Sequence, residues 1–175
     1  MTCDIFDCAL FNQYRVDVPY PEVVVTGPNP QWAALLSGIM AGKGSETTAI
    51  AQYGTHRFFT GAWPDIYTAY QYIAFVEMTH FSLLGHLVLR LGTNPKMFSY
   101  EDMRWWSGAD PEYHQAIRPI LESDMEGERG AIAHYTRLIG EIPDESIRAL
   151  LRRIILDEQR HLEVLGQLYA ALESG

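Results

Sequence analysis

Residues 66–91 read IYTAYQYIAFVEMTHFSLLGHLVLRL, and this stretch decides the fold. Its apolar residues recur at steps of three and four, the spacing of one face of an α-helix. Glu77 and His80 fall on the same face as the apolar residues. A carboxylate isolated in such surroundings is costly unless it is protonated, paired or bound to a cation. The predicted face comprises Ile66, Tyr70, Ile73, Glu77, His80, Leu84, Leu87 and Leu91.

A second Glu-x-x-His element, Glu158 and His161, lies on another apolar helical stripe near the end of the chain. Taken alone, one such element on an amphipathic helix has a structural explanation as readily as a functional one. Two of them on separate helices raise the question of further ligands. The second stripe comprises Ile147, Leu151, Ile154, Glu158, His161, Leu165, Leu168 and Leu172.

Each Glu-x-x-His element is preceded by a lone glutamate in a shared template, E-x-x-A-I-A-x-Y. The template occurs at Glu46–Tyr53 and at Glu128–Tyr135, and each glutamate lies 31 or 30 residues before the next motif glutamate. The chain therefore reads as two related helical hairpins. Four-helix bundles build di-metal carboxylate sites from this combination of residues. The predicted metal ligands are Glu46, Glu77, His80, Glu128, Glu158 and His161.

Carboxylates and imidazoles suit intermediate first-row metals, so the ligand types admit two ions per chain of either iron or manganese. Two divalent ions would neutralise four buried glutamates. Tyr53 and Tyr135 lie two helical turns after the lone glutamates, on the same inward line. Each tyrosine is expected either to hydrogen-bond a ligand, to act as a redox-active neighbour, or to be a core residue with a satisfied hydroxyl.

Helical phase separates ligands from bystanders. Glu126 is rotated by about 200° from Glu128, so Glu128 is the predicted ligand. His56 lies about 15 Å along its helix from Glu46, which favours a supporting or structural role. The remaining histidines are predicted to be non-ligands, namely His86, His114 and His134.

Composition narrows the class of protein further. The 175 residues carry 13 Lys and Arg against 22 Asp and Glu, a net charge of −9, which argues against nucleic-acid and anionic-membrane partners. Charged and polar residues interrupt the apolar run at 66–91, which favours a buried helix over a membrane span. The N-terminal residues do not resemble a signal peptide, so a cytoplasmic location is expected. Cys3 and Cys8 are expected to be reduced; the alternative is a local disulfide between them or a redox role.

The chain divides into an extended N-terminal arm, 1–28, and a four-helix domain, 29–175. The first helix is expected to start at Asn29–Pro30, to break at Gly42–Gly44 and to end by Thr60. The second ends at Gly92, and a long crossover, 93–110, follows. The third helix is expected from Asp110–Pro111, with a kink or late start at Pro119, and the fourth follows a turn at 142–144. Trp105 and Trp106 are expected to plug one end of the bundle.

These motifs resemble those of the ferritin-like superfamily. SETTAIAQY (45–53) with FVEMTH (75–80) is similar to bacterioferritins and rubrerythrins. YPEVVVTGPNPQWAALL (20–36) and IRALLRRIILDEQRHLEVL (147–165) resemble the manganese-catalase-like group, which includes spore-coat relatives. The resemblance covers residues 19–172 and implies a ferritin-like bundle with the six ligands named above. In manganese catalases the glutamate matching Glu158 is an acid or base outside the ligand shell, so both roles stay open.

The function expected from the resemblance is a redox enzyme of catalase or peroxidase type, acting on hydrogen peroxide or dioxygen at a di-iron or dimanganese centre. Glu158, Tyr53 and Tyr135 are its candidate catalytic residues. The rubredoxin-like cysteine quartet of rubrerythrins is missing, so any electron donor would be external. The alternatives are a non-catalytic metal-binding or iron-storage protein and a structural coat-associated protein.

The second helix also predicts a homodimer. The face opposite Glu77 and His80 is apolar where a bundle helix ordinarily shows polar residues to water. A two-fold partner would cover it, and so would residues 1–28 or the tryptophan-containing crossover. The residues of this face are Tyr72, Phe75, Met78, Leu83 and Leu89.

Overall fold

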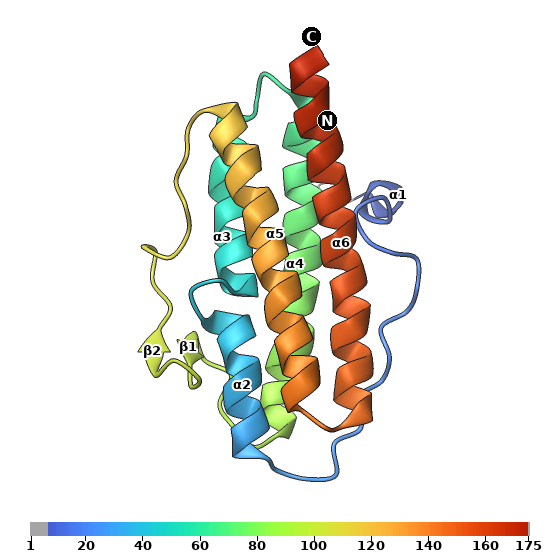
Figure 1. The fold of residues 1–175 in the computed structure, drawn as a ribbon, viewed down its shortest axis with the longest axis vertical. Helices are drawn as coiled ribbons and strands as arrows, with labels where there is room; N and C mark the ends of the chain where they lie inside the picture. The colour runs from blue at the N-terminus through green and yellow to red at the C-terminus, as the bar shows by residue number, and fades with distance from the viewer. Residues whose placement is uncertain (1–6, 175) are drawn as a thin grey trace.

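A computed structural model of the chain describes residues 7–174. The described residues form four long helical segments that run side by side along the length of the molecule (Figure 1). The predicted all-α four-helix bundle with one long crossover is confirmed. Its elements are α1 (Cys8–Phe11), α2 (Pro30–Ala41), α3 (Glu46–His56), the 3₁₀ turn η1 (Arg57–Phe59), α4 (Pro64–Arg90), β1 (Phe98–Ser99), β2 (Arg104–Trp105), α5 (Ile117–Glu141) and α6 (Glu145–Ser174).

The first bundle helix is built from two pieces, α2 and α3, as the sequence predicts. The side chain of Asn29 caps α2 by accepting a hydrogen bond from the backbone N–H of Trp32 at 3.1 Å, and Pro30 occupies the first turn. The chain breaks at Gly42, and the hydroxyl of Ser45 then caps α3. This second start places Glu46 at the first position of α3, facing the interior.

A side chain at Gly42 is expected to destabilise this break. A Cβ on Gly42 would collide with the backbone carbonyl oxygen of Gly38, whereas a Cβ on Gly44 would meet nothing. We expect Gly42→Ala to lower the free energy of unfolding by about 1–3 kcal/mol, the usual cost of overpacking. Gly44→Ala, the matched control, is expected to change it little. Thermal unfolding of both variants measures the difference, and equal melting temperatures would contradict this account of the break.

Helix α4 packs against α2, α3 and α6. Among the described residues it is the one helix that passes a length-and-hydropathy test for a membrane span. Its inner face is buried against the other helices, and Glu77 and His80 belong to that face. The helix ends where Gly92 adopts a positive φ of 85°, as predicted from the glycine.

The crossover from α4 to α5 is longer than predicted. The third helix begins at Ile117 rather than at Asp110, so the start near Asp110–Pro111 is wrong and the late start at Pro119 is confirmed. Asp110 does not cap a helix, because its carboxylate accepts hydrogen bonds from the backbone N–H of Ser107 and from Arg104. Pro119 lies in the first turn of α5, where a missing N–H costs nothing.

The two tryptophans of the crossover do not plug a bundle end, and that prediction is wrong. The crossover contains a short antiparallel ladder of β1 and β2, which lies beside α2 (Figure 1). Trp105 is exposed on this ladder, next to the ammonium group of Lys96. Trp106 donates from its indole N–H to the hydroxyl of Thr48 at 2.9 Å, which fastens the crossover to the start of α3.

The N-terminal arm, residues 7–28, runs along α6 (Figure 1). It contains the single-turn helix α1, whereas the sequence predicted an extended arm. The side chain of Asp7 caps α1 by accepting hydrogen bonds from two backbone N–H groups. Backbone carbonyls of the arm accept hydrogen bonds from Arg153 and Arg160 of α6 and from Arg90 of α4. Cys8 is free and exposed, and Cys3 lies outside the described residues.

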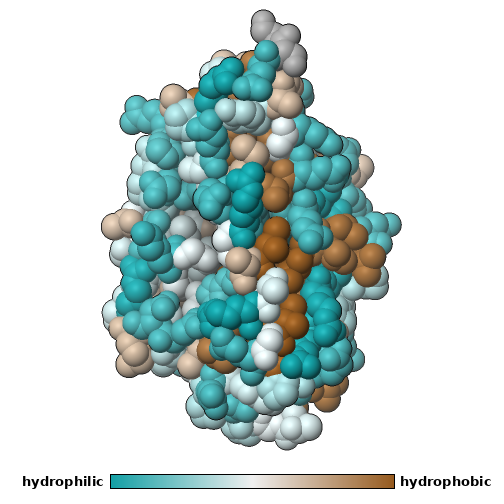
Figure 2. Space-filling view, in the orientation of Figure 1, coloured by the Kyte–Doolittle hydropathy of each residue, from teal (hydrophilic) through white to brown (hydrophobic). Residues whose placement is uncertain are grey.

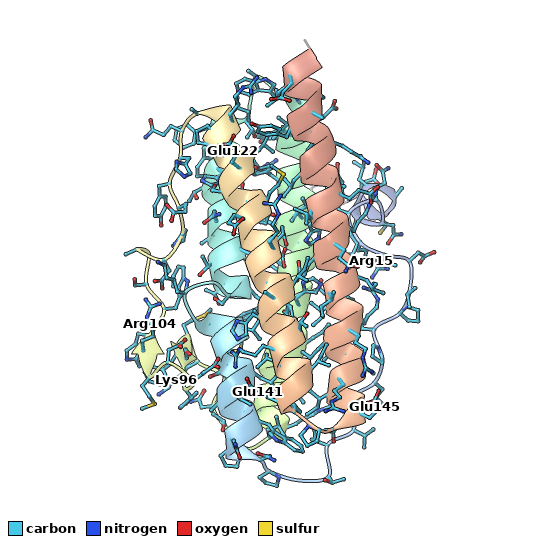
Figure 3. All side chains as sticks on the ribbon, in the orientation of Figure 1. Arg15, Lys96, Arg104, Glu122, Glu141 and Glu145 are labelled. Atoms are coloured by element: carbon cyan, nitrogen blue, oxygen red, sulfur yellow. The ribbon has the colours of Figure 1, made fainter. Side chains whose placement is uncertain are left out.

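The face of the bundle that carries α5 and α6 is largely polar (Figure 2). Figure 2 shows a mostly hydrophilic face, with a narrow apolar band between α5 and α6. Figure 3 shows charged side chains such as Glu122, Glu141 and Glu145 at the periphery, and all three are exposed. The glutamates of the two templates and the two Glu-x-x-His elements point inward instead.

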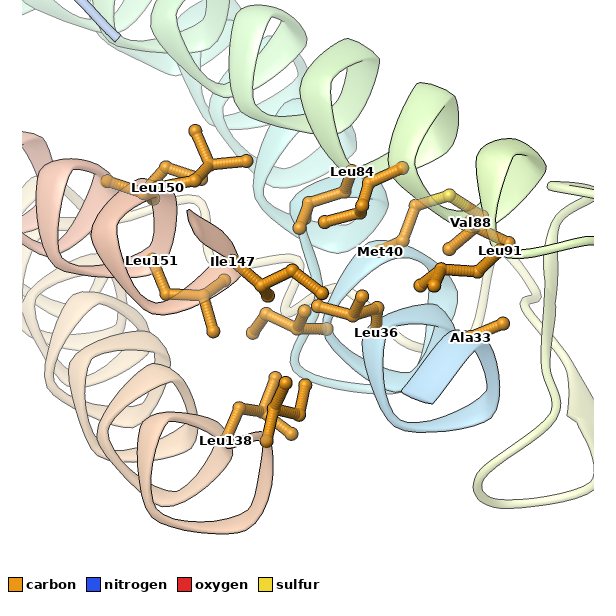
Figure 4. Close-up of a cluster of buried hydrophobic side chains, with 14 of the residues drawn as sticks. Ala33, Leu36, Met40, Leu84, Val88, Leu91, Leu138, Ile147, Leu150 and Leu151 are labelled. Carbon is orange, nitrogen blue, oxygen red and sulfur yellow. The ribbon is translucent and has the colours of Figure 1, made fainter. Parts of the chain in front are cut away.

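Two apolar clusters fill the interior, one at each end of the bundle. The first joins α2 to the facing halves of α4, α5 and α6, and includes Leu36, Leu84 and Leu138 (Figure 4). The second joins α3 to the other halves of the same helices, around Tyr70 and Ile120. The inward-facing glutamates and histidines lie along each helix between these clusters, so apolar packing surrounds a polar layer.

The N-terminal arm covers part of the outer face of α4, and the homodimer through this face stays a prediction. The arm covers Tyr72, whose ring stacks on Tyr14 with centroids 5.8 Å apart, so coverage by residues 1–28 is confirmed there. Met78 and Leu89 remain 52% and 59% exposed. We expect Met78→Glu to reduce the molecular mass measured by light scattering from dimer to monomer. Met97→Glu, at an exposed methionine of the crossover, is the control and should leave the mass unchanged; a monomeric parent protein would exclude the dimer.

Candidate metal centre

The structure brings all six predicted ligands into one buried layer, and none is more than 4% exposed. They form two overlapping sets, and the ligand atoms of each set lie within 4.8 Å of one another. Such a distance allows each set to surround one ion. The first set is Glu46, Glu77, His80 and Glu158; the second is Glu77, Glu128, Glu158 and His161.

Glu77 and Glu158 belong to both sets, and each spans the two histidines. Glu77 places one carboxylate oxygen 3.1 Å from Nδ1 of His80 and the other 3.0 Å from Nδ1 of His161. Glu158 likewise lies 3.1 Å from each of these nitrogens. Glu46 approaches only His80, at 3.6 Å, and Glu128 approaches only His161, at 3.5 Å. The arrangement has two bridging and two terminal carboxylates.

The two template tyrosines hold the terminal carboxylates crosswise. Tyr53 donates its hydroxyl to Glu128, and Tyr135 donates its hydroxyl to Glu46. Each tyrosine thus reaches from its own hairpin to the glutamate of the other one. Of the alternatives that the sequence leaves open, a hydrogen bond to a predicted ligand is the one that the structure displays.

The protonation of these side chains follows from their burial and crowding. Burial and the neighbouring carboxylates Glu77 and Glu158 raise the pKa of Glu46 well above its ordinary value. Burial and the charge of Glu77 do the same to the pKa of Glu128. Burial disfavours ionised Glu77 too, but attraction to His161 and to His80, with the hydrogen bond from His80, outweighs it and lowers the pKa. The raised pKa values favour protons on Glu46 and Glu128 when no metal is bound. Bound cations would offset the same negative charge.

The histidines show the reverse balance. Burial disfavours the charged imidazole of His80, but attraction to Glu158 and hydrogen bonds to carboxylates outweigh it and raise the pKa. Attraction to Glu77 and Glu128 outweighs burial in the same way and raises the pKa of His161. Both imidazoles turn Nδ1 toward the carboxylates, so both offer that atom to an ion.

Asp157 is a functional residue that the sequence reasoning missed. It is fully buried, and its carboxylate lies 3.1 Å from Nε2 of His80. Its other partners are the hydroxyl of Tyr20, the backbone N–H of Val16 and the guanidinium of Arg153. The hydrogen bond and charge of His80, with the hydrogen bonds from Tyr20 and Val16, outweigh burial and lower the pKa of Asp157 to about 2. The sequence did contain a signal for it, because Asp157 directly follows the apolar residues 154–156 and directly precedes the predicted ligand Glu158.

Asp124 is the second missed residue, and it lies one turn before Glu128. It is buried and accepts hydrogen bonds from Gln52 and Tyr70, both at 2.6 Å. Nδ1 of His56 lies 3.0 Å from the same carboxylate. His56 therefore belongs to this supporting network, in agreement with the prediction.

The predicted non-ligands lie away from the two sets. Glu126 is exposed and pairs with Arg129 at 3.3 Å, which agrees with the helical phase that selected Glu128. His86 is exposed, with Nδ1 2.8 Å from a backbone carbonyl, and His134 pairs with Glu101. Within residues 7–174, neither set includes His56, His86, His114 or His134.

A small cavity reaches the layer from the side of the bundle, between α3 and α5. Its volume is about 70 Å³, enough for about two water molecules. The four predicted glutamate ligands form its inner wall. Its lining also includes Gly44 and Gly127, which are both exposed. The cavity therefore extends from the glutamates toward the surface at these two glycines, which have no side chain to block it. Molecules the size of water or hydrogen peroxide fit it.

The residues of the layer fit a pair of divalent cations. Four carboxylates and two Nδ1 atoms supply oxygen and nitrogen donors suited to manganese or iron. Among the described residues, Oε1 of Glu77 and Oε1 of Glu158 accept no hydrogen bond although both are buried. Oε1 of Glu77 lies 3.0 Å from Nδ1 of His161, and Oε1 of Glu158 lies 3.1 Å from Nδ1 of His80. The geometry of these two contacts is unsuitable for a hydrogen bond. A buried carboxylate oxygen without a donor is well placed to coordinate a cation.

Comparison with known proteins gives structural matches only. No protein-family model matches the chain, and no curated protein matches it. The manganese catalase KatB from Anabaena superposes with a TM-score of 0.82 over 90% of this chain and 79% of its own, at 22% identity. Mycobacterium tuberculosis bacterioferritin BfrA gives 0.69 over 85% and 90%, at 21% identity.

A third match is the Rhodobacter capsulatus bacterioferritin described with a metal-free dinuclear site and heme iron. It gives a TM-score of 0.71 over 85% of this chain and 89% of its own, at 19% identity. Manganese catalase and bacterioferritin are both ferritin-like di-metal carboxylate proteins. These similarities, together with the paired hairpins and their inward-facing glutamates, place this chain in the ferritin-like fold.

Proposed function

We propose that the protein is a di-metal carboxylate oxidoreductase that decomposes hydrogen peroxide. The observation that carries the proposal is the pair of overlapping ligand sets, in which Glu77 and Glu158 each face both histidines. The structural similarity to a manganese catalase supports the same reaction. Dioxygen is the second substrate that such a centre would accept.

Peroxide decomposition also suits the rest of the chain. In this reaction one peroxide is reduced to water and another is oxidised to dioxygen, so no separate electron donor is required. The cavity beside the glutamates, of about 70 Å³, has room for a molecule of the size of hydrogen peroxide.

Two ions, of manganese or iron, would relay two electrons from the peroxide that is oxidised to the peroxide that is reduced, by changing oxidation state. Glu46, Glu77, His80, Glu128, Glu158 and His161 would hold them. Tyr53 and Tyr135 fix the terminal carboxylates through their hydroxyls. Glu158 lines the cavity and has one oxygen without a hydrogen bond. That oxygen has two alternative roles: it coordinates an ion, or, with Glu158 outside the ligand shell, it accepts a proton from peroxide and returns it to a product.

Elemental analysis and an oxygen electrode test this proposal together. Protein purified without added metal is expected to contain manganese or iron, up to two ions per chain, and to release dioxygen from hydrogen peroxide. Metal-free protein reloaded with Mn²⁺ or Fe²⁺ should show which ion supports turnover. Absence of dioxygen release from protein with both positions filled would overturn the enzymatic proposal.

The alternative of iron storage predicts a different result in the same experiment. A storage protein takes up iron well beyond two ions per chain, whereas the proposed centre saturates at two. A structural role predicts two ions, raised thermal stability and no turnover. Stoichiometry and dioxygen release therefore separate the three functions.

A further inference from the structure

The two histidines of the metal layer have unequal surroundings. Nε2 of His80 lies 3.1 Å from the carboxylate of Asp157. Nε2 of His161 is buried and has no hydrogen-bond partner within residues 7–174. The inequality can be traced to one position in the repeat. The residue before Glu158 is Asp157, a carboxylate, whereas the residue at the matching position before Glu77 is Val76, which is apolar.

This difference acts on a metal through the far nitrogen of each ring. An imidazole that ligates through Nδ1 carries its proton on Nε2. On His80 that N–H would meet an ionised carboxylate, which orients the ring and strengthens it as a ligand. On His161 the N–H would be buried without an acceptor, which is unfavourable.

The N-terminal arm completes the Asp157 carboxylate. Val16 donates its backbone N–H at 2.7 Å to one oxygen, and Tyr20 donates its hydroxyl at 2.6 Å to the other. Arg153 binds the carbonyls of Val16 and Val18, and its guanidinium lies 2.8 Å from Asp157. The arm thus fixes the acid that faces His80, although it contributes no ligand of its own.

We propose that Asp157, held by the arm, is a positioning residue that makes the His80 side the tighter of the two ion positions, so that it fills first. The inference rests on the metal binding proposed above. Loss of a hydrogen-bonded partner of a ligating histidine typically weakens binding by about 10–100-fold, which sets the expected separation of the two dissociation constants.

Stepwise addition of Mn²⁺ to metal-free protein tests the order of filling. Calorimetry is expected to give two dissociation constants that differ by about 10–100-fold. Crystals grown with one equivalent of Mn²⁺ should show anomalous scattering beside His80. In Asp157→Asn the two constants should approach each other, because the amide is a weaker acceptor, and hydrogen exchange of the Val16 amide should accelerate.

Glu173→Gln, which removes an exposed carboxylate from the same helix, is the control and should leave both constants unchanged. Equal occupancy in the unmodified protein, or a first ion beside His161, would overturn the inference, even if Asp157→Asn fails to fold. An unchanged separation in Asp157→Asn would overturn it as well. If no Mn²⁺ binds at either position, the metal centre itself is wrong, and that result is distinct from equal binding.

Discussion

Replacing Glu128 with alanine is expected to remove one or both metal ions, whereas Glu126→Ala is expected to leave the stoichiometry unchanged. Glu128 is buried among the ligand atoms of its set, and Glu126 is an exposed neighbour two residues away on the same helix. Loss of a ligand should weaken binding by more than the about 10–100-fold that a supporting residue costs. Elemental analysis after dialysis against a weak chelator measures the stoichiometry.

The comparison controls for changes in the helix itself, because both variants replace a glutamate of α5 with alanine. Thermal unfolding of the two metal-free variants shows whether each is folded before metal is added. If Glu126→Ala loses metal and Glu128→Ala retains it, the predicted phase of α5 toward the metal is wrong.

Metal-free protein is expected to become more stable on mild acidification, and bound metal is expected to abolish that gain. The pKa values of Glu46, Glu128, His80 and His161 are raised in the folded chain. Groups with raised pKa values bind more protons folded than unfolded, so their stabilisation is complete below the unfolded pKa and lost as pH rises through the folded pKa. Each contributes up to about 1.4 kcal/mol per pH unit within its window.

The opposite sign applies to Glu77 and Asp157, whose pKa values are lowered. Their stabilisation is present above the unfolded pKa and lost as pH falls toward the folded one. The melting temperature of metal-free protein should therefore rise from about pH 8 to about pH 5 and fall below about pH 4. Bound cations displace the protons, so metal-loaded protein should lack the rise.

Thermal scans of both forms across this pH range provide the measurement. Metal-free Glu128→Gln should show a shallower rise, because an amide stands permanently in place of the protonated acid. Identical pH profiles for metal-free and metal-loaded protein would contradict the crowding of carboxylates as the cause.

The sequence by itself determined which residues face the interior. Helical periodicity placed Glu77 with His80 and Glu158 with His161 on apolar stripes, and the repeated template added Glu46 and Glu128. Periodicity is a local property of the chain, so it is legible without tertiary structure. The same logic chose Glu128 over Glu126, and the glycines at 42 and 44 located the break in the first helix.

Only the tertiary structure decided which partners those faces meet. Asp157 and His80 are separated by 77 positions, and Asp157 with Tyr20 by 137, so no spacing rule connects them. Asp110 could cap a helix or anchor a loop, and its contact with Arg104 selected the loop. Periodicity gives the direction of a side chain from its own helix, but hydrogen-bond partners depend on how the helices and the arm pack against one another.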